Sequence, residues 1–245
     1  MGKPGYRNDN TTGVARGDQA ETIYMVIKGR HFNDGCCFDY GNAETNNMDT
    51  GPGSMEALFW GNRTDRSTGA GHGPWVMADL EKGLWSGSAR HNPDNTPILA
   101  DFATAMLKGR PCGGFDPDGH GSSEDCFALK AGDASTSTLK TMFSGGRPQE
   151  YSAGIKLQGA IVLGIGVSLE RSERQPSSQV RSKLTEVLFA RARRFAPPRA
   201  QGDNSDSGVG TFFEGAMTAG WSSDATDAAV QASVASVGYA LIRQQ

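Results

Sequence analysis

Short apolar runs separated by glycine dominate the hydrophobic pattern of this chain. Five clear examples are ETIYMVIKG, MEALFWG, CFALKAG, GAIVLGIG and GTFFEGAMTAG. Runs of this kind, bounded by turn-forming residues, predict β-strands joined by tight turns. The chain has 245 residues, 33 glycines and no linker-like stretch between two halves. We therefore expect one all-β domain, and a two-sheet β-sandwich fits this spacing better than a helical or alternating fold.

The C-terminal end of the chain follows a different pattern. Alanine and valine recur at helical spacing within residues 222–245. Ser223 can cap the first turn there, and Asp224 and Asp227 suit the positive end of a helix. A short C-terminal helix is therefore expected. Residues 98–109, ILADFATAMLKG, fit a strand and a helix equally well, so the pattern leaves their structure open.

Charge and hydropathy exclude some kinds of partner. The net charge of −3 argues against a nucleic acid or another polyanion, and no apolar run approaches the length of a membrane span. The first residues lack a hydrophobic leader, which by itself favours the cytosol. Glycosylation sequons at Asn10 and Asn62 point weakly the other way, towards secretion.

Residues 167–201 have a composition unlike the rest of the chain. They contain no glycine, eight basic and three acidic residues, so they carry +5 while the other 210 residues carry −8. A surface insertion, disordered or helical, would explain this composition. A retained intron would explain it equally, since Val167-Ser168 and Gln201 can be encoded by typical splice-site sequences. Removal of the segment would join VLGIG to GDNSDSGVGTFFEG and restore a glycine-rich turn between two strands.

The stretch GPWVMADLEKGLWSG, residues 73–87, carries the candidate chemistry. Strand alternation would place Val76, Ala78 and Leu80 on one face and Trp75, Met77, Asp79 and Glu81 on the other. A pair of carboxylates alone is more often part of a solvated face. Here Trp75 and Trp85 flank the pair, and tryptophan is a residue type that stacks on sugar rings. Because carboxylates in partly apolar surroundings can have tuned pKa values, we expect a carbohydrate site.

Asp203 is the second candidate, because an aspartate on a loop between glycines can approach a ligand closely; taken alone it would be an ordinary turn residue. No metal or other cofactor is expected, since the four histidines lie in no ligand spacing and the loop at 116–127 departs from the calcium-binding pattern. Cys112 and Cys126 could close a 15-residue loop, which would stabilise the fold by about 3 kcal/mol in the chain-entropy model. Two buried thiols are an equally good interpretation.

The adjacent pair Cys36-Cys37 raises a separate question. Neighbouring Cα atoms lie about 3.8 Å apart across a trans peptide, below the usual disulfide range of about 4.4 to 6.8 Å. A bridge between neighbours therefore forms a strained eight-membered ring, and strain of this kind is commoner at functional sites. The residues alone leave two free thiols and a vicinal disulfide as alternatives.

Four motifs occur in order along the chain: FNDGCCFDYGNAET, GPWVMADLEKGLWSG, GAIVLGIG and GDNSDSGVGTFFEGAMTAG. Together they closely resemble the catalytic domain of fungal α-L-arabinofuranosidase B, glycoside hydrolase family 54. The resemblance implies a concanavalin-like β-sandwich of jelly-roll type, in agreement with the strand pattern. It also implies a secreted, monomeric retaining hydrolase without a cofactor. Such an enzyme removes terminal α-L-arabinofuranosyl residues from the arabinan and arabinoxylan of plant cell walls.

The resemblance assigns roles to individual positions. It implies that Glu81 is the nucleophile, that Asp203 is the general acid and base, and that Asp79 and Gly202 bind the sugar. In a retaining enzyme the carboxyl groups of the nucleophile and of the acid should lie about 5 to 5.5 Å apart. A carbohydrate-binding sandwich without catalysis is the competing hypothesis, and a separation beyond about 10 Å would favour it.

For the adjacent cysteines, the resemblance implies a vicinal disulfide between Cys36 and Cys37 that presents its sulfurs to the furanose. Two departures from the family pattern affect the same site. The family has asparagines directly after the nucleophile, where this chain has Lys82 and Gly83, and an aromatic residue where this chain has Arg66.

Relative to the family, the chain starts partway into the catalytic domain and ends before the C-terminal arabinose-binding domain. A sandwich that is incomplete at its N-terminus is therefore expected, and an inactive fragment is a third hypothesis.

Overall fold

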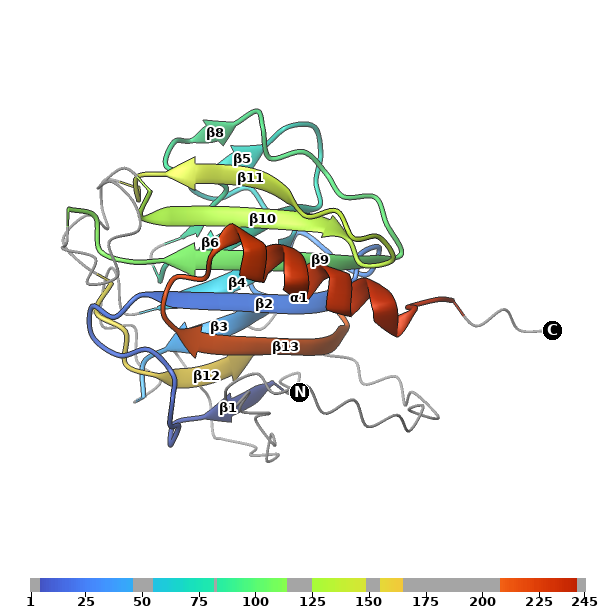
Figure 1. Ribbon diagram of the computed structural model, residues 1–245. Coiled ribbons are helices and arrows are strands. Elements are labelled where there is room, and N and C mark those ends of the chain that lie inside the picture. Colours follow the sequence, from blue (N-terminus) through green and yellow to red (C-terminus); the bar gives the residue numbers. More distant parts are fainter. Residues whose placement is uncertain are drawn as a thin grey trace.

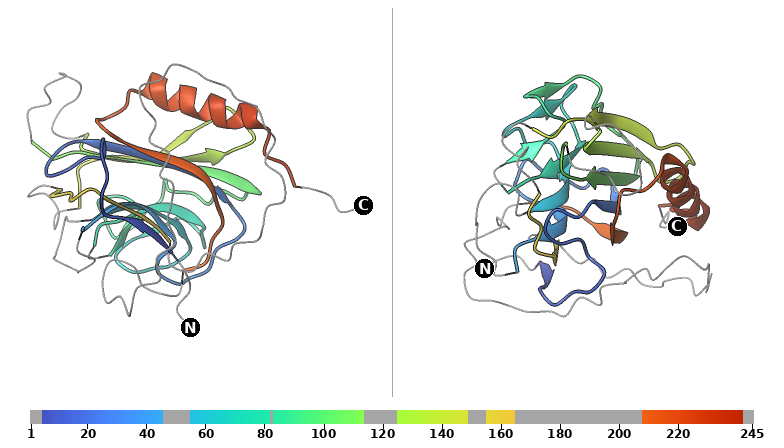
Figure 2. Two further views of the ribbon diagram at one scale, coloured as in Figure 1. Left: turned by 90° about the horizontal axis from the view of Figure 1, so that it is seen from below. Right: turned by 60° about the vertical axis from the view of Figure 1, so that its left-hand side comes forward.

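The computed structural model describes residues 5–45, 55–81, 83–113, 125–148, 155–164 and 208–241. These residues form two antiparallel β-sheets packed face to face, with one helix on the outside (Figures 1 and 2). The elements are β1 (Tyr6–Asn8), β2 (Glu21–Lys28), β3 (Asp39–Ala43), β4 (Glu56–Gly61), β5 (Thr68–Gly69), β6 (Trp75–Asp79), β7 (Leu84–Trp85), β8 (His91–Asn92), β9 (Phe102–Gly109), β10 (Phe127–Asp133), β11 (Lys140–Gly145), β12 (Ala160–Leu163), β13 (Phe212–Ala219) and α1 (Asp224–Val237). The expected β-sandwich and the C-terminal helix are confirmed.

The larger sheet has six strands in the order β1-β12-β3-β4-β6-β7, and the smaller has five in the order β11-β10-β9-β2-β13. Strands β5 and β8 form a separate parallel pair. Seen from below in Figure 2, the helix, the five-stranded sheet and the six-stranded sheet form three successive layers. The outer face of the five-stranded sheet is therefore covered by α1, and the candidate residues of β6 belong to the other sheet.

All five apolar runs between glycines contain a strand, namely β2, β4, β10, β12 and β13. The ambiguous run at 98–109 also contains one, β9, which pairs with β2 on one side and β10 on the other. This central position explains why the run is a strand, because its backbone N–H and C=O groups on both sides form hydrogen bonds with neighbouring strands. Residues 167–201, together with Gly202 and Asp203, lie outside the described residues.

The main core lies between the two sheets. From β2 it receives Ile23, Met25 and Ile27, and from β6 it receives Val76 and Ala78. The alternate residues of β2 face outward, where Val26 is buried beneath α1 in a cluster with Val234 of the helix. Strand β2 is thus buried on both faces, which explains why its sequence is apolar almost throughout.

A polar cluster is buried between the sheets at one end of the sandwich. Arg147 pairs with Glu56 at 2.7 Å, with both side chains fully buried, and the Asn42 amide donates a hydrogen bond to Glu21. Burial, followed by the nearby charge of Glu56, raises the pKa of Glu21 well above its usual value. A Cβ on Gly109 would lie 1.6 Å from the Glu56 carboxylate. Glycine at this position therefore makes room for the ion pair.

Helix α1 begins after Ser223, whose hydroxyl accepts a hydrogen bond from the amide of Thr226, as the sequence predicts. Asp227 complements the helix dipole and also binds two lysines of the neighbouring sheet. Its side chain is buried and accepts hydrogen bonds from Lys108 at 2.9 Å and Lys130 at 2.6 Å, both on the five-stranded sheet. The helix is therefore attached to the sheet by buried ion pairs as well as by apolar contacts.

Among the described residues, no helix is long and apolar enough to cross a membrane.

We predict that Asp227→Ala destabilises the fold by about 3–5 kcal/mol, because it removes the buried carboxylate from two buried ammonium groups and leaves them only the exposed carboxylate of Asp224. Asp224→Ala is the matched control: Asp224 contacts the same Lys130 at 2.7 Å, but its side chain is 90% exposed. That change should cost at most about 1 kcal/mol. Denaturant unfolding of both variants measures the difference, and equal losses would contradict the importance of the buried pair.

Candidate active site

The candidate site lies on the outer face of the six-stranded sheet, where β3, β4 and β6 are neighbours. Strand alternation is confirmed through Asp79. Val76, Ala78 and Leu80 lie in the core between the sheets. Trp75 and Met77 lie in a second cluster on the opposite face, with Cys37, Phe59 and Leu84. The wall of the site is therefore apolar, and Asp79 is a carboxylate at its edge.

Glu81 reaches the site in a different way from the one the alternation predicts. Strand β6 ends at Asp79, and a hydrogen bond of 3.3 Å from the Leu80 amide to the Gly83 carbonyl closes a turn. Glu81 has a positive φ of 71° within this turn, and its amide donates to the Asp79 carboxylate at 3.1 Å. Both carboxylate oxygens of Glu81 are buried. The turn, and not the period of a strand, therefore brings the backbone of Glu81 against the Asp79 carboxylate.

The disulfide between Cys36 and Cys37 is present, and the peptide bond between them is cis. Both sulfurs and a carboxylate oxygen of Asp79 lie within 4.8 Å of one another. Bonded sulfurs are not thiolates, so this trio does not have the donor atoms of a metal site. It places an apolar, polarisable surface directly beside a carboxylate.

Asp39, the first residue of β3, is a further member of the site that the sequence analysis missed. Its side chain is fully buried, with both carboxylate oxygens enclosed. Burial, and then the nearby carboxyl group of Asp79, raise the pKa of Asp39 well above its usual value. Its position two residues after Cys37, within the motif FNDGCCFDYGNAET, was the available signal.

The same burial raises the pKa of Asp79 to about 6. The hydrogen bond from the Glu81 amide and the nearby carboxyl group of Asp39 act in the opposite direction and lower the pKa of Asp79. More distant charges contribute less: Asp65 raises the pKa of Asp79, and Arg63 lowers it. Asp79 is therefore a desolvated carboxylate with a raised pKa, a property that is commoner at functional sites than elsewhere.

The expectation that Trp75 and Trp85 offer their rings to a sugar is wrong. Trp85 pairs with Ala78 across β6 and β7, so both point into the core between the sheets. Trp75 lies on the outer face but is 3% exposed, and its indole nitrogen donates to the Ala70 carbonyl. Trp75 therefore packs in the same apolar cluster as the disulfide, and Trp85 packs in the core between the sheets.

The two departures from the family pattern are in direct contact. A Cβ on Gly83 would lie 2.2 Å from Cγ of Arg66 and 3.1 Å from a carboxylate oxygen of Asp65. The Arg66 side chain therefore packs over the turn that carries Glu81, in the space that a side chain at position 83 would occupy. With arginine at 66 in this position, glycine at 83 is the residue that fits without a clash.

The structure also contains the disulfide between Cys112 and Cys126, one of the two alternatives that the sequence left open. Asn62 is half-buried, and its glycosylation stays a prediction. Gly202 and Asp203 lie outside the described residues. The chain is described again from Gly208, where an added Cβ would lie 2.5 Å from the backbone of Cys37. Gly208 thus packs directly against the backbone of the disulfide-bonded Cys37.

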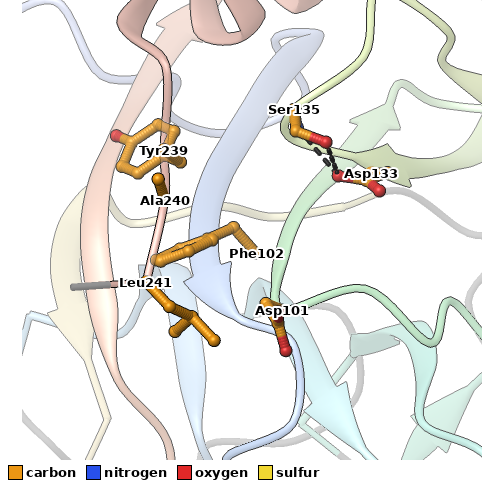
Figure 3. Close-up of a pocket in the computed structure, with 7 residues that line it drawn as sticks. All are labelled: Asp101, Phe102, Asp133, Ser135, Tyr239, Ala240 and Leu241. Carbon is orange, nitrogen blue, oxygen red and sulfur yellow. Dashed lines mark hydrogen bonds between the residues drawn. The ribbon is translucent and has the colours of Figure 1, made fainter. Parts of the chain in front are cut away.

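A pocket beside the end of α1 is separate from this site (Figure 3). It has a volume of about 130 Å³ and is lined by Asp101, Phe102, Asp133, Ser135, Tyr239, Ala240 and Leu241. Its polar groups already have protein partners. Asp133 accepts from the amide and hydroxyl of Ser135, and Asp101 pairs with Arg30. The pocket is therefore a gap in the packing of the helix against the five-stranded sheet.

A β-sandwich whose sheet carries clustered carboxylates beside an apolar wall has the residue types that glycoside hydrolysis uses. The chain belongs to the family whose model is described as "Alpha-L-arabinofuranosidase B, catalytic", which matches residues 1–175 and 200–240. The matched range includes all of the candidate residues. It leaves out residues 176–199, which lie inside the segment of foreign composition.

Curated relatives agree with this assignment. The chain is 41% identical over 239 residues to an arabinofuranosidase/β-xylosidase of Trichoderma koningii, covering 97% of this chain. It is also 41% identical to α-L-arabinofuranosidase B of Emericella nidulans, covering 96% of this chain. In both cases the chain spans 38% of the length of the relative.

Solved structures of family-54 arabinofuranosidases have the same fold. A mutant soaked with 4-nitrophenyl α-L-arabinofuranoside matches 98% of this chain and 40% of its own, with a TM-score of 0.73 and 36% identity. An arabinofuranosidase complexed with arabinofuranosyl-α-1,2-xylobiose matches 96% of this chain and 40% of its own, with a TM-score of 0.71 and 37% identity.

We predict that Gly83→Ala destabilises the protein by about 1–3 kcal/mol, because alanine is strained at a φ of 129° and its Cβ meets Arg66. Arg66→Ala in the same chain should recover part of this loss. Gly220→Ala is the matched control for backbone strain alone, since Gly220 has a φ of 107° and open space around its Cα. Unfolding free energies of the single and double variants test the coupling; strictly additive losses would show that Arg66 does not occupy the space.

Proposed function

We propose that this protein is a retaining glycoside hydrolase that releases terminal, non-reducing α-L-arabinofuranosyl residues. The observation that carries the proposal is the position of the Asp79 carboxylate, which lies beside the Cys36–Cys37 disulfide on the outer face of the sheet and accepts a hydrogen bond from the Glu81 amide. Family membership adds the substrate class. The relatives are arabinofuranosidases, and one related structure holds an arabinofuranosyl-xylobiose.

In the proposed mechanism Glu81 is the nucleophile. Its carboxylate attacks the anomeric carbon of the arabinofuranosyl unit and forms a covalent glycosyl-enzyme, while Asp203 donates a proton to the departing oxygen. Asp203 then takes a proton from water, the hydroxide attacks the anomeric carbon, and Glu81 leaves as a carboxylate. Two carboxyl groups and one water complete the reaction, so the mechanism requires no metal or other cofactor.

The role of Asp203 rests on the family match, which covers positions 202 and 203. It is supported by the path of the chain five residues later, where the backbone of Gly208 lies against Cys37. The amide of Val209 also donates to Asn33, just before the disulfide, at 2.9 Å.

Asp79 and the disulfide are proposed to bind the sugar. An ionised carboxylate accepts hydrogen bonds from sugar hydroxyls, and it does so more strongly where water is excluded. The two sulfurs offer an apolar surface to the carbon-bonded side of a furanose. The substrate would be arabinan or arabinoxylan of plant cell walls, met outside the cell by a secreted, glycosylated monomer.

The test is hydrolysis of an aryl α-L-arabinofuranoside by the full chain. Glu81→Gln should reduce kcat by more than about 1,000-fold, because the amide cannot form the covalent intermediate. Glu214→Gln is the matched control, since Glu214 is a half-buried carboxylate on β13 of the other sheet and should leave the rate unchanged. Equal rates for the wild type and Glu81→Gln would contradict the assignment. Sugar binding without turnover would favour a carbohydrate-binding module.

A further inference from the structure

The turn that carries Glu81 has a backbone conformation that its own sequence does not favour. Glu81 has a φ of 71° although it is not a glycine, and Gly83 has a φ of 129°. Residues with side chains rarely adopt a positive φ, and they keep it only where the surrounding structure imposes it. The contacts that hold this turn therefore decide where the Glu81 side chain lies.

The turn is held at both of its ends. Before it, Leu80 is buried in the core between the sheets, and after it, Leu84 is buried in the outer cluster that includes Cys37. The Leu80 amide donates to the Gly83 carbonyl at 3.3 Å. The Glu81 amide donates to the carboxylate at the end of β6 at 3.1 Å. These contacts fix where the turn begins and where it ends.

Arg66, on the loop between β4 and β5, contacts the same turn at Gly83. A Cβ on Gly83 would lie 2.2 Å from Cγ and 3.3 Å from Cβ of Arg66. Since a Cβ is only one bond away from its Cα, the backbone of Gly83 is itself in van der Waals contact with these two carbons. The contact is thus made by the aliphatic part of the arginine side chain, which packs against a surface as the stems of long charged side chains commonly do.

The position of Arg66 is fixed by the residues that follow it. Ser67 is buried, and its hydroxyl donates to the Ala89 carbonyl at 2.7 Å. The hydroxyl of Ser86, which is also buried, donates to the Thr68 carbonyl at 2.7 Å. Ser86 directly follows β7, the strand into which the turn leads. The loop that carries Arg66 and the chain that follows β7 are therefore hydrogen-bonded to each other, so Arg66 contacts the turn from a fixed position.

We propose that Arg66 is a positioning residue of this site: the aliphatic part of its side chain holds the turn in the conformation that presents Glu81. The inference rests on the proposed function, in which Glu81 is the nucleophile. A displacement of about 1 Å from the geometry of attack can cost about 100-fold in rate. Asp79 lies on β6 itself and pairs with β4 and β7, so its own position depends less on the turn. Arg66 should therefore affect the chemical step more than the binding of the sugar.

Two substitutions separate the aliphatic part of Arg66 from its charge. Arg66→Met keeps the Cβ and Cγ that contact Gly83 and removes the guanidinium, so kcat/KM should stay within about threefold of the wild type. Arg66→Ala removes the Cγ, so kcat/KM should fall by about 10- to 100-fold. Arg16→Ala is the matched control, because Arg16 packs in the same way over Gly159, which has a φ of 84° and directly precedes β12. It should leave the rate unchanged.

The first readout is the split between chemistry and binding for an aryl α-L-arabinofuranoside. In Arg66→Ala the loss should appear in kcat/KM, whereas the inhibition constant of free L-arabinose should stay within about twofold of the wild type. An equal loss in both constants would overturn the inference, because it would make Arg66 a sugar-binding residue. An Arg66→Met variant as impaired as Arg66→Ala would also overturn it, because the charge would then be what matters.

The second readout is hydrogen exchange of the Leu80 and Glu81 amides, which measures the turn without any substrate. Both amides donate hydrogen bonds that belong to the turn. They should exchange at least about tenfold faster in Arg66→Ala than in the wild type, and within about threefold of the wild type in Arg66→Met. Arg16→Ala should leave both exchange rates unchanged.

The two readouts distinguish the possible failures. A wild type without hydrolysis, in which Arg66→Ala still speeds the exchange of these amides, would overturn the proposed function and leave the contact between Arg66 and the turn standing. An active wild type whose Arg66→Ala variant keeps the same rate and the same exchange would overturn the positioning role and leave the hydrolase standing.

Discussion

Burial of the Asp79 carboxylate at the end of β6 is the constraint on which the rest of the site depends. A carboxylate removed from water strongly disfavours its ionised form unless hydrogen bonds compensate. Here the amide of Glu81 donates a hydrogen bond to the carboxylate, and this bond accompanies the tight turn after β6. The turn places Glu81 next to Asp79 in the chain fold, and the Cys36–Cys37 disulfide lies directly before β3.

In the sandwich the inner faces of the two sheets form the common core, and their outer faces differ in what they carry. In the five-stranded sheet the outer face is covered by α1, which is held through Asp227 and two buried lysines. In the six-stranded sheet the outer face carries the candidate site. Strand β6 belongs to both environments, with Val76 and Ala78 in the core and Met77 and Asp79 on the outer face. Substitutions on its inner face would therefore disturb the site indirectly, through the position of the strand.

Part of the fold could be predicted from local sequence, because β2, β4, β10, β12 and β13 are short apolar runs bounded by glycine, and the helix has a capping serine and helical spacing. Residues 98–109 could not be assigned, since only the partners β2 and β10 decide that they form a strand. In the site, alternation located Asp79 but not the turn that holds Glu81, because the period of a strand says nothing beyond its end. The sequence analysis also missed Asp39, because the proximity of β3 to Asp79 on β6 depends on the order of strands in the sheet, which local sequence does not reveal. Trp85 was misassigned because flanking position in sequence does not reveal which face a residue occupies.

The most direct test of the account is to identify the residue that becomes covalently bonded to the sugar. Rapid acid quench of the full chain during turnover of an aryl α-L-arabinofuranoside with a good leaving group, followed by proteolysis and mass spectrometry, would locate the adduct. The account predicts one anhydroarabinose unit on the peptide that contains Glu81, and none in Glu81→Gln. An adduct on another carboxylate, or turnover with inversion and no adduct, would contradict the central claim that the turn after β6 presents the nucleophile.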